Sequence, residues 1–213
     1  MTLKPPIRHC KICLNEIKIF DFCRLFDPNI CICQSCQKEL DPKFINFRVD
    51  KYSALALYEY NAFIKNQIYT YKGCFDYELK DIFLNLFLNE LSYRYKGYKI
   101  IPVPSFKNDD ELRGFNHVVE VFKLLGLEML EIIEKTEHFK QAEKGAKQRR
   151  QIRKYMRIKE SVDLSKTHVL IVDDIYTTGS TMKTVINLVE KLNPKSISVL
   201  VLAKTKEKGV TKI

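Results

Sequence analysis

The sequence predicts an α/β protein, in which a parallel sheet flanked by helices follows a small cysteine-rich module. From Tyr52 onward, short apolar runs alternate with helical patterns of apolar residues, an order typical of βαβ units. Before that point, six of the seven cysteines lie between residues 10 and 36, and no regular helical or strand period is evident. We therefore expect a metal-binding module at 1–45 and an α/β domain at 46–213.

The size and composition limit the possible classes. A chain of 213 residues, 46% of them apolar, can form one sizeable core and a small additional module. No run approaches the roughly 18 apolar residues that a membrane-spanning helix needs. The N-terminus also lacks the apolar stretch of a signal peptide. We therefore expect a cytoplasmic protein with reduced cysteines, for which metal binding is a better explanation of the cysteine cluster than disulfides.

The elements of the α/β domain can be predicted in chain order. Apolar runs predict strands at 52–58, 99–103, 127–134, 169–172 and 196–202. Apolar residues spaced close to 3.6 apart predict helices at 62–71, 77–95, 115–125 and 180–192. Gly126 is placed to end the third helix. Cys74, alone in this domain, is expected to be a small core residue.

The strand at 169–172 leads into the most informative motif, Asp173-Asp174-Ile175-Tyr176-Thr177-Thr178-Gly179-Ser180-Thr181. Acids at the C-terminal end of a parallel strand lie where ligands bind in open α/β sheets. Small hydroxyl residues around a glycine then open a helix, whose free N–H groups and positive dipole end favour phosphate. The carboxylates repel phosphate and suit sugar hydroxyls or Mg²⁺. An ordinary strand-to-helix turn is the alternative interpretation.

The whole string resembles the signature with which type I phosphoribosyltransferases bind phosphoribosyl pyrophosphate (PRPP). The resemblance implies that Asp173 and Asp174 hold the ribose hydroxyls and that residues 177–181 surround the 5-phosphate. It also implies Mg²⁺ on the pyrophosphate, for which Lys72 is a candidate cationic partner. The predicted PRPP-binding residues are Asp173, Asp174, Tyr176, Thr177, Thr178, Gly179, Ser180, Thr181 and Lys72.

The N-terminal cysteines include two C-x2-C pairs, Cys10 with Cys13 and Cys33 with Cys36, separated by nineteen residues. Tetrahedral Zn²⁺ takes four thiolates, and this spacing is typical of a four-cysteine structural site. Such a site nucleates folding and has no open position for catalysis. Cys31 could replace Cys33, and His9 could also be a ligand, so these alternatives stay open.

Charge is concentrated in one segment. Of the formal net charge of +10, residues 140–159 supply +8, with nine basic residues and one acid. The segment is either a solvated, flexible loop, taken here as 135–159, or a binding surface for a polyanion. The predicted DNA-binding residues are Arg149, Arg150, Arg153, Lys154 and Arg157.

The order of these motifs resembles that of the ComF family, amidophosphoribosyltransferase-like proteins of natural competence. The resemblance rests on the cysteine pairs, Lys72-Gly73, the Arg113-Gly114-Phe115-Asn116 string and the PRPP loop. It implies a type I phosphoribosyltransferase fold with an N-terminal zinc finger. It also implies a cytoplasmic factor, peripheral to the inner membrane, that binds PRPP and single-stranded DNA and works with the competence DNA-translocation machinery. Phosphoribosyl transfer itself is left open.

Two other functions compete with this one. A nucleobase-salvage phosphoribosyltransferase is the alternative, but such an enzyme needs neither a cysteine module nor the basic segment. A zinc-ribbon transcription factor leaves the PRPP loop unexplained.

Overall fold

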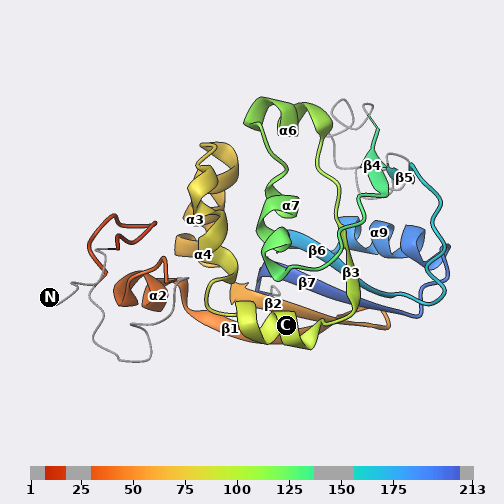
Figure 1. Ribbon diagram of the computed structural model, residues 1–213, viewed down its shortest axis with the longest axis horizontal. Coiled ribbons are helices and arrows are strands. Elements are labelled where there is room, and N and C mark those ends of the chain that lie inside the picture. The colour runs from red at the N-terminus through yellow and green to blue at the C-terminus, as the bar shows by residue number, and fades with distance from the viewer. Residues whose placement is uncertain (1–7, 18–29, 137–155, 207–213) are drawn as a thin grey trace, which may run out of the picture.

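The computed structural model describes residues 8–17, 30–136 and 156–206 (Figure 1). Its main sheet has the strand order β1-β2-β7-β6-β3. The strands are β1 (Pro42–Val49), β2 (Tyr52–Glu59), β7 (Ser196–Lys204), β6 (His168–Tyr176) and β3 (Tyr98–Pro102). The last four run parallel to one another, and β1 pairs antiparallel with β2. The predicted parallel sheet is thus confirmed, with an antiparallel strand added at one edge.

Helices connect these strands. They are α2 (Gln34–Leu40), α3 (Ala62–Gly73), α4 (Lys80–Leu84), α5 (Leu88–Arg94), α6 (Lys107–Arg113), α7 (His117–Phe122) and α9 (Ser180–Glu190). Two 3-10 turns, η1 (Tyr77–Leu79) and η2 (Lys123–Leu125), precede α4 and follow α7. Two short strands, β4 (Ile133–Lys135) and β5 (Met156–Ile158), form a separate antiparallel pair.

The sheet is covered on both faces, as Figure 1 shows. Successive side chains of a strand point to opposite faces, so each central strand contributes to two apolar layers. Leu170 and Val172 of β6 lie in the layer formed with α3, α4 and α7. Val169 and Ile171 lie in the layer formed with α9. The continuous apolar run at 169–172 is therefore explained by burial on both faces.

The helix predicted at 77–95 is wrong as a single element. It is divided into η1, α4 and α5, and the break lies around Asn85 and Phe87. Phe87 leaves helical geometry with φ −120° and packs its ring against Phe44 and Tyr58, at centroid distances of 4.9 and 5.6 Å. Tertiary aromatic packing therefore outweighs the helical period at this point.

Two smaller predictions also need correction. The apolar segment 127–134 forms no continuous strand, because only Met129 makes a bridge to β3 and regular pairing begins at Ile133. Cys74 is exposed and is not a core residue. It follows the last turn of α3, where the chain leaves the packed face of the helix.

The cysteine-rich segment packs against the α/β domain. Cys10, Cys31, Cys36 and Leu40 belong to the same buried apolar cluster as Tyr58 and Phe83. Lys11 adds ion pairs to α4 and η1, with its Nζ 2.5 Å from Asp81 Oδ2 and 2.8 Å from Glu78 Oε2. Strand β1 begins at Pro42 and continues to Val49, so it spans the boundary predicted near residue 45.

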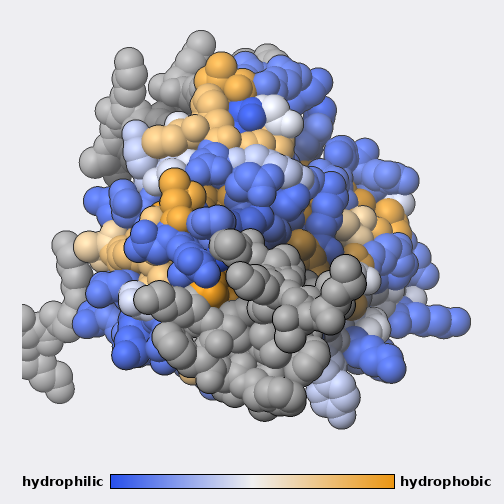
Figure 2. Space-filling view, turned by 60° about the vertical axis from the view of Figure 1, so that its left-hand side comes forward, coloured by the Kyte–Doolittle hydropathy of each residue, from blue (hydrophilic) through white to orange (hydrophobic). Residues whose placement is uncertain are grey.

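The described residues on the face shown in Figure 2 are mostly hydrophilic, with apolar groups between the charged ones. Exposed large apolar side chains include Leu14, Tyr69, Tyr93 and Leu112, which come from different elements. Within the described ranges, every helix is too short or too polar to cross a bilayer.

Candidate functional site

Strand β6 carries the two acids to the C-terminal edge of the sheet. Its neighbour β3 pairs with it only as far as Pro102 opposite Val172, so Asp173 and Asp174 lie just beyond the last paired position on that side. On the other side, β6 stays paired with β7 through Tyr176. The acids are thus fixed by one neighbouring strand and open toward the space beyond the end of the other.

The loop after β6 turns sharply into α9. Gly179 has φ +73°, and a Cβ there would lie 2.8 Å from Cζ of Tyr176, so both conformation and space require glycine. Thr178 Oγ1 and Ser180 Oγ are 3.0 Å apart. No side chain of the described residues caps the N-terminus of α9, which leaves its first N–H groups open to a ligand. A hollow of ≈ 50 Å³ is lined by Asp173 and Ile175–Met182.

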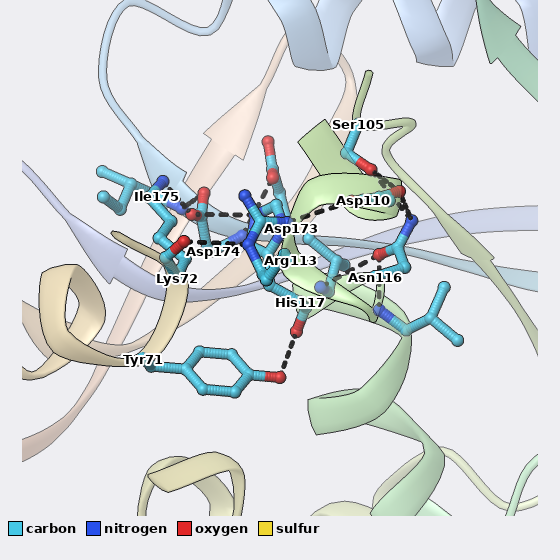
Figure 3. Close-up of polar contacts among 12 residues, drawn as sticks. Tyr71, Lys72, Ser105, Asp110, Arg113, Asn116, His117, Asp173, Asp174 and Ile175 are labelled. Atoms are coloured by element: carbon cyan, nitrogen blue, oxygen red, sulfur yellow. Dashed lines mark hydrogen bonds and ion pairs between the residues drawn. The ribbon is translucent and has the colours of Figure 1, made fainter. Parts of the chain in front are cut away.

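Asp174 is surrounded by donors, as Figure 3 shows. Its Oδ2 lies 2.5 Å from Lys72 Nζ and 3.3 Å from His117 Nε2. Its Oδ1 accepts the Ile175 N–H at 2.6 Å. The side chain is only 13% exposed. Lys72 and His117 come from α3 and α7, so three distant segments meet at this carboxylate.

The pKa values of the two acids are shifted in opposite directions. Burial raises the pKa of Asp173 well above its ordinary value, and the charge of Asp174 raises it further. Burial would also raise the pKa of Asp174, but the hydrogen bond from His117 and the charge of Lys72 outweigh it, so that pKa is lowered. The pair therefore favours one ionised and one protonated carboxyl. Opposed pKa shifts in neighbouring acids are typical of functional sites.

Further polar contacts hold Lys72 and His117 in place. Arg113 Nε donates to the backbone oxygen of Lys72 at 2.8 Å, and its Nη1 lies 3.0 Å from Asp110 Oδ1 and 3.2 Å from His117 Nδ1. Asp110 also accepts from Asn116 Nδ2 at 2.9 Å and from Ser105. These contacts connect the start of α7 with the end of α3.

The structure brings the residues of the predicted loop together around one hollow, and it brings Lys72 to Asp174. His117, Asp110 and Ser105 were missed by the sequence reasoning. The available signal was the Arg113-Gly114-Phe115-Asn116 string, which directly precedes His117. Asn116 has a local role in this string, because its Oδ1 accepts from the N–H groups of Val118 and Val119 and so caps α7.

The four predicted zinc ligands converge. Sγ atoms of Cys10, Cys13, Cys33 and Cys36 all lie within 4.8 Å of one another. A tetrahedral site with Zn–S bonds of about 2.3 Å separates its sulfurs by roughly 3.8 Å, and Cys13 Sγ lies 3.7 Å from Cys33 Sγ. The donor set and its spacing therefore fit a four-thiolate metal site.

The surroundings shift the pKa values of these thiols in different directions. Burial disfavours the Cys10 thiolate, but N–H groups of Cys13, Cys33 and Ile12 outweigh burial and lower its pKa to about 7. Burial and the neighbouring thiols raise the pKa of Cys36. Cys31 lies outside the cluster, and burial raises its pKa to about 12. His9 is also outside it, so neither alternative ligand joins the described cluster.

The predicted DNA-binding residues are only partly described. Arg149, Arg150, Arg153 and Lys154 lie outside the described residues. Arg157, on β5, is within them, and its Nε is 2.6 Å from Glu134 Oε1 on β4. Its side chain is 71% exposed, so this surface ion pair leaves it accessible to solvent.

Comparison with known proteins bears on the acid pair and the loop that follows it. The phosphoribosyl transferase domain family matches residues 113–212, which include the acid pair and the loop before α9. Competence protein ComFC of Streptococcus pneumoniae is 32% identical over 149 residues, covering 70% of this chain and 67% of that protein. The predicted phosphoribosyltransferase-like fold is thereby confirmed.

Solved structures of phosphoribosyltransferases are also similar. A hypoxanthine phosphoribosyltransferase from Staphylococcus aureus is 16% identical with a TM-score of 0.37, covering 61% of this chain and 66% of the enzyme. The chain thus spans slightly less than two thirds of that enzyme's length. A purine phosphoribosyltransferase from Pyrococcus horikoshii is 28% identical with a TM-score of 0.36, covering 55% of this chain and 67% of the enzyme. With the identity and coverage of the pneumococcal relative, this chain belongs to the ComFC family of phosphoribosyltransferase-like competence proteins.

Proposed function

We propose that this chain binds PRPP with Mg²⁺ at the acid pair and the 177–181 loop, and that it handles single-stranded DNA during natural transformation. The observation that carries the PRPP proposal is a hollow lined by Asp173 and by the uncapped N-terminus of α9, with Asp174 next to Asp173 on β6. An anion is favoured at the helix end and hydroxyl groups at the carboxylates. PRPP has both chemical groups within one molecule.

Each part of the site has a role in this proposal. The N–H groups and hydroxyls of 177–181 bind the 5-phosphate, and the acids accept from the ribose hydroxyls. Lys72, which is 34% exposed and lies 2.5 Å from Asp174, would be a cationic partner for the pyrophosphate. Mg²⁺ would neutralise charge on the pyrophosphate, and carboxylate oxygens of Asp173 and Asp174 would be candidate ligands for it.

Zinc in the four-cysteine site would act structurally. Four thiolates complete a tetrahedral shell and leave no position for substrate. The packing of Cys10 and Cys36 into the main core supports a role in joining the module to the α/β domain. We therefore assign zinc to folding and PRPP binding to the loop.

The DNA part of the proposal rests on the ComFC relationship and on the charge of 140–159. Nine cations and one acid in that segment favour a phosphate backbone. We propose that the protein works at the cytoplasmic side of the inner membrane, with the competence DNA-translocation machinery as its partner.

The PRPP site is tested by thermal unfolding. PRPP with Mg²⁺ should raise the melting temperature of the wild type, because a ligand that binds only the folded state stabilises it. Asp174→Ala combined with Thr178→Ala should remove the shift while the protein without ligand still unfolds cooperatively. A double mutant that keeps the whole shift would exclude this loop as the site.

The DNA site is tested by reversing Arg149, Arg150, Arg153 and Lys154 to Glu. Single-strand affinity should fall steeply, and the wild-type log–log salt slope should be about −0.7 for each phosphate neutralised. The PRPP-induced shift should persist in the mutant. Unchanged DNA affinity with lost PRPP binding would instead favour a flap over pyrophosphate and the nucleobase-salvage enzyme.

A further inference from the structure

Asp174 has two side-chain partners at the same oxygen, and they are held differently. Lys72 Nζ and His117 Nε2 both approach Oδ2. Lys72 is 34% exposed on a flexible stem, whereas the His117 side chain is 12% exposed. His117 is also fixed by its backbone, since its carbonyl accepts from Tyr71 Oη at 3.0 Å. The histidine is therefore the more rigid partner of the carboxylate.

The contacts of Arg113 determine which nitrogen of His117 carries the proton. A guanidinium has only donors, so an Arg113 Nη1 that lies 3.2 Å from His117 Nδ1 must donate to it. Nη1 has two hydrogens, and the other points to Asp110 Oδ1 at 3.0 Å. Nδ1 is then an acceptor without a hydrogen. In a neutral imidazole the remaining proton lies on Nε2, which faces Asp174.

A doubly protonated imidazole does not fit this arrangement. Its Nδ1 hydrogen would point at a hydrogen of Arg113 Nη1, so two donors would face each other. The charged groups around the ring are Lys72 and Asp174 on the Nε2 side, and Arg113 and Asp110 on the Nδ1 side. Asp174 already has the positive charge of Lys72 beside it, so a charged histidine is not needed for neutralisation.

We propose that His117 is a positioning residue of the PRPP site, a neutral imidazole whose Nε2–H orients the Asp174 carboxylate and whose tautomer is set by Arg113. The role in binding rests on the function proposed above. Arg113 also holds the Lys72 backbone oxygen, so one guanidinium anchors both partners of Asp174. The Arg113-Gly114-Phe115-Asn116 string and His117 therefore act together, because they connect the end of α3 with the acid pair.

The tautomer is tested without any ligand. Long-range ¹H–¹⁵N correlation spectra of the ¹⁵N-labelled full chain at neutral pH distinguish protonated from unprotonated ring nitrogens. The His117 signals are assigned as those that disappear in His117→Gln. We expect an unprotonated Nδ1 and a protonated Nε2. A proton on Nδ1, alone or in an imidazolium, would overturn the assignment.

The positioning role is tested by PRPP–Mg²⁺ titration calorimetry on three variants. His117→Gln keeps an N–H donor and should bind within about threefold of the wild type, since the hydrogen bond is retained. His117→Leu removes the donor and should weaken binding about tenfold or more, as expected for a lost hydrogen bond to a charged group. His168→Leu is the matched control, because His168 bonds Ser196 at the other end of β6 and should leave affinity unchanged.

The outcomes separate the two proposals. Equal loss in His117→Gln and His117→Leu would show that the ring is needed for packing, and would contradict the positioning role. Wild-type affinity in His117→Leu would contradict it as well. Should the wild type itself not bind PRPP, the proposed function fails, while the ¹⁵N spectra still decide the Arg113–His117–Asp174 arrangement. Should His117→Leu not fold, the wild-type spectra and the affinity of His117→Gln decide the positioning role.

Discussion

The cysteine site and the acid pair are two polar clusters of the same chain, and they handle charge in opposite ways. The four thiols come from two segments and converge on one point, so a single cation can satisfy all of them. The two acids are adjacent in sequence. Asp174 has Lys72 and His117 at its carboxylate, whereas Asp173 is buried beside the charge of Asp174 and accepts the Asp174 N–H. The first cluster can stabilise the fold through metal binding. The second keeps an unfavourable carboxyl in place, which is typical of a site prepared for a ligand.

The largest effect should come from breaking the cysteine site. Cys33→Ser removes one thiolate, while the serine hydroxyl can still cap α2 by accepting the Cys36 N–H, which Cys33 Sγ accepts at 3.5 Å. Structural zinc in small modules contributes on the order of 10 kcal/mol of apparent binding free energy. We therefore expect bound zinc to fall from one per chain to near none, and proteolysis within residues 8–45 to accelerate.

Cys74→Ser is the control for that experiment. Cys74 is exposed and lies outside the cysteine cluster, so this variant should keep its zinc. Full zinc content in Cys33→Ser, measured by elemental analysis, would contradict the assignment of the ligands.

Removing the charge of Asp174 should have the next largest effect. Asp174→Asn removes the charge that Lys72 and His117 face, and should lower the free energy of unfolding by about 2 kcal/mol in urea denaturation. The loss is smaller than for a fully buried pair because Lys72 is one-third exposed and can turn into water. Asp163→Asn, at an exposed carboxylate that accepts only from Ser165 among described residues, is the control. Equal stability of Asp174→Asn and wild type would contradict the proposed pairing.

The neighbouring acid should respond with the opposite sign. Asp173→Asn removes a buried carboxyl next to a like charge, and its amide oxygen can still accept the Asp174 N–H, as Asp173 Oδ1 does at 2.9 Å. We expect the free energy of unfolding to rise by about 1 kcal/mol at neutral pH. The same variant should bind PRPP and Mg²⁺ more weakly. A destabilised Asp173→Asn would show that the buried Asp173 carboxyl is not unfavourable to the fold.

The pH dependence of stability follows from the same shift. Because the pKa of Asp173 is raised in the folded state, the folded protein holds this proton where the unfolded chain has lost it. The contribution of Asp173 to stability therefore declines as pH rises from its ordinary value of 3.8 to the raised value. Asp174 has the opposite sign, and its contribution is lost as pH falls below 3.8. Chemical denaturation at several pH values above 3.8 should show the free energy of unfolding of the wild type falling with rising pH relative to that of Asp173→Asn. An identical pH dependence in the two proteins would contradict the raised pKa of Asp173.

The loop backbone should also respond, with a destabilisation of at least about 1 kcal/mol. Gly179→Ala places a Cβ at φ +73° and against the Tyr176 ring. The left-handed conformation costs an alanine about 1 kcal/mol, and the contact with the ring adds to it. Tyr176→Ala in the same chain should relieve the contact but not the backbone cost, so the two mutations should be non-additive in a double-mutant cycle. Full additivity would show that the ring moves aside freely.

The sequence predicted those parts of the molecule that depend on local pattern. The run at 169–172, the loop at 177–181 and the two cysteine pairs each have a short-range signature, and the structure brings each set together. The predictions that failed concern segments whose structure depends on contacts with residues distant in the sequence. Phe87 interrupts a helical period to pack on Phe44 and Tyr58.

The partners of Asp174 show the same limit. Lys72 and His117 lie 102 and 57 positions away in the chain, and no spacing rule connects them with the acid. The Lys72-Gly73 dipeptide points to Lys72, whereas the only sequence signal for His117 is that it follows the string at 113–116. Only the fold places both at one oxygen.

The central claim is that the acid pair and the following loop form a PRPP site, and a crystal structure of the chain with PRPP and Mg²⁺ tests it most directly. We predict the 5-phosphate at about 2.7–3.1 Å from N–H and hydroxyl groups of 177–181, with the ribose hydroxyls at the acid pair and His117 still bonded to Asp174. PRPP bound elsewhere on the chain, or turned so that the pyrophosphate occupies the loop, would contradict the account.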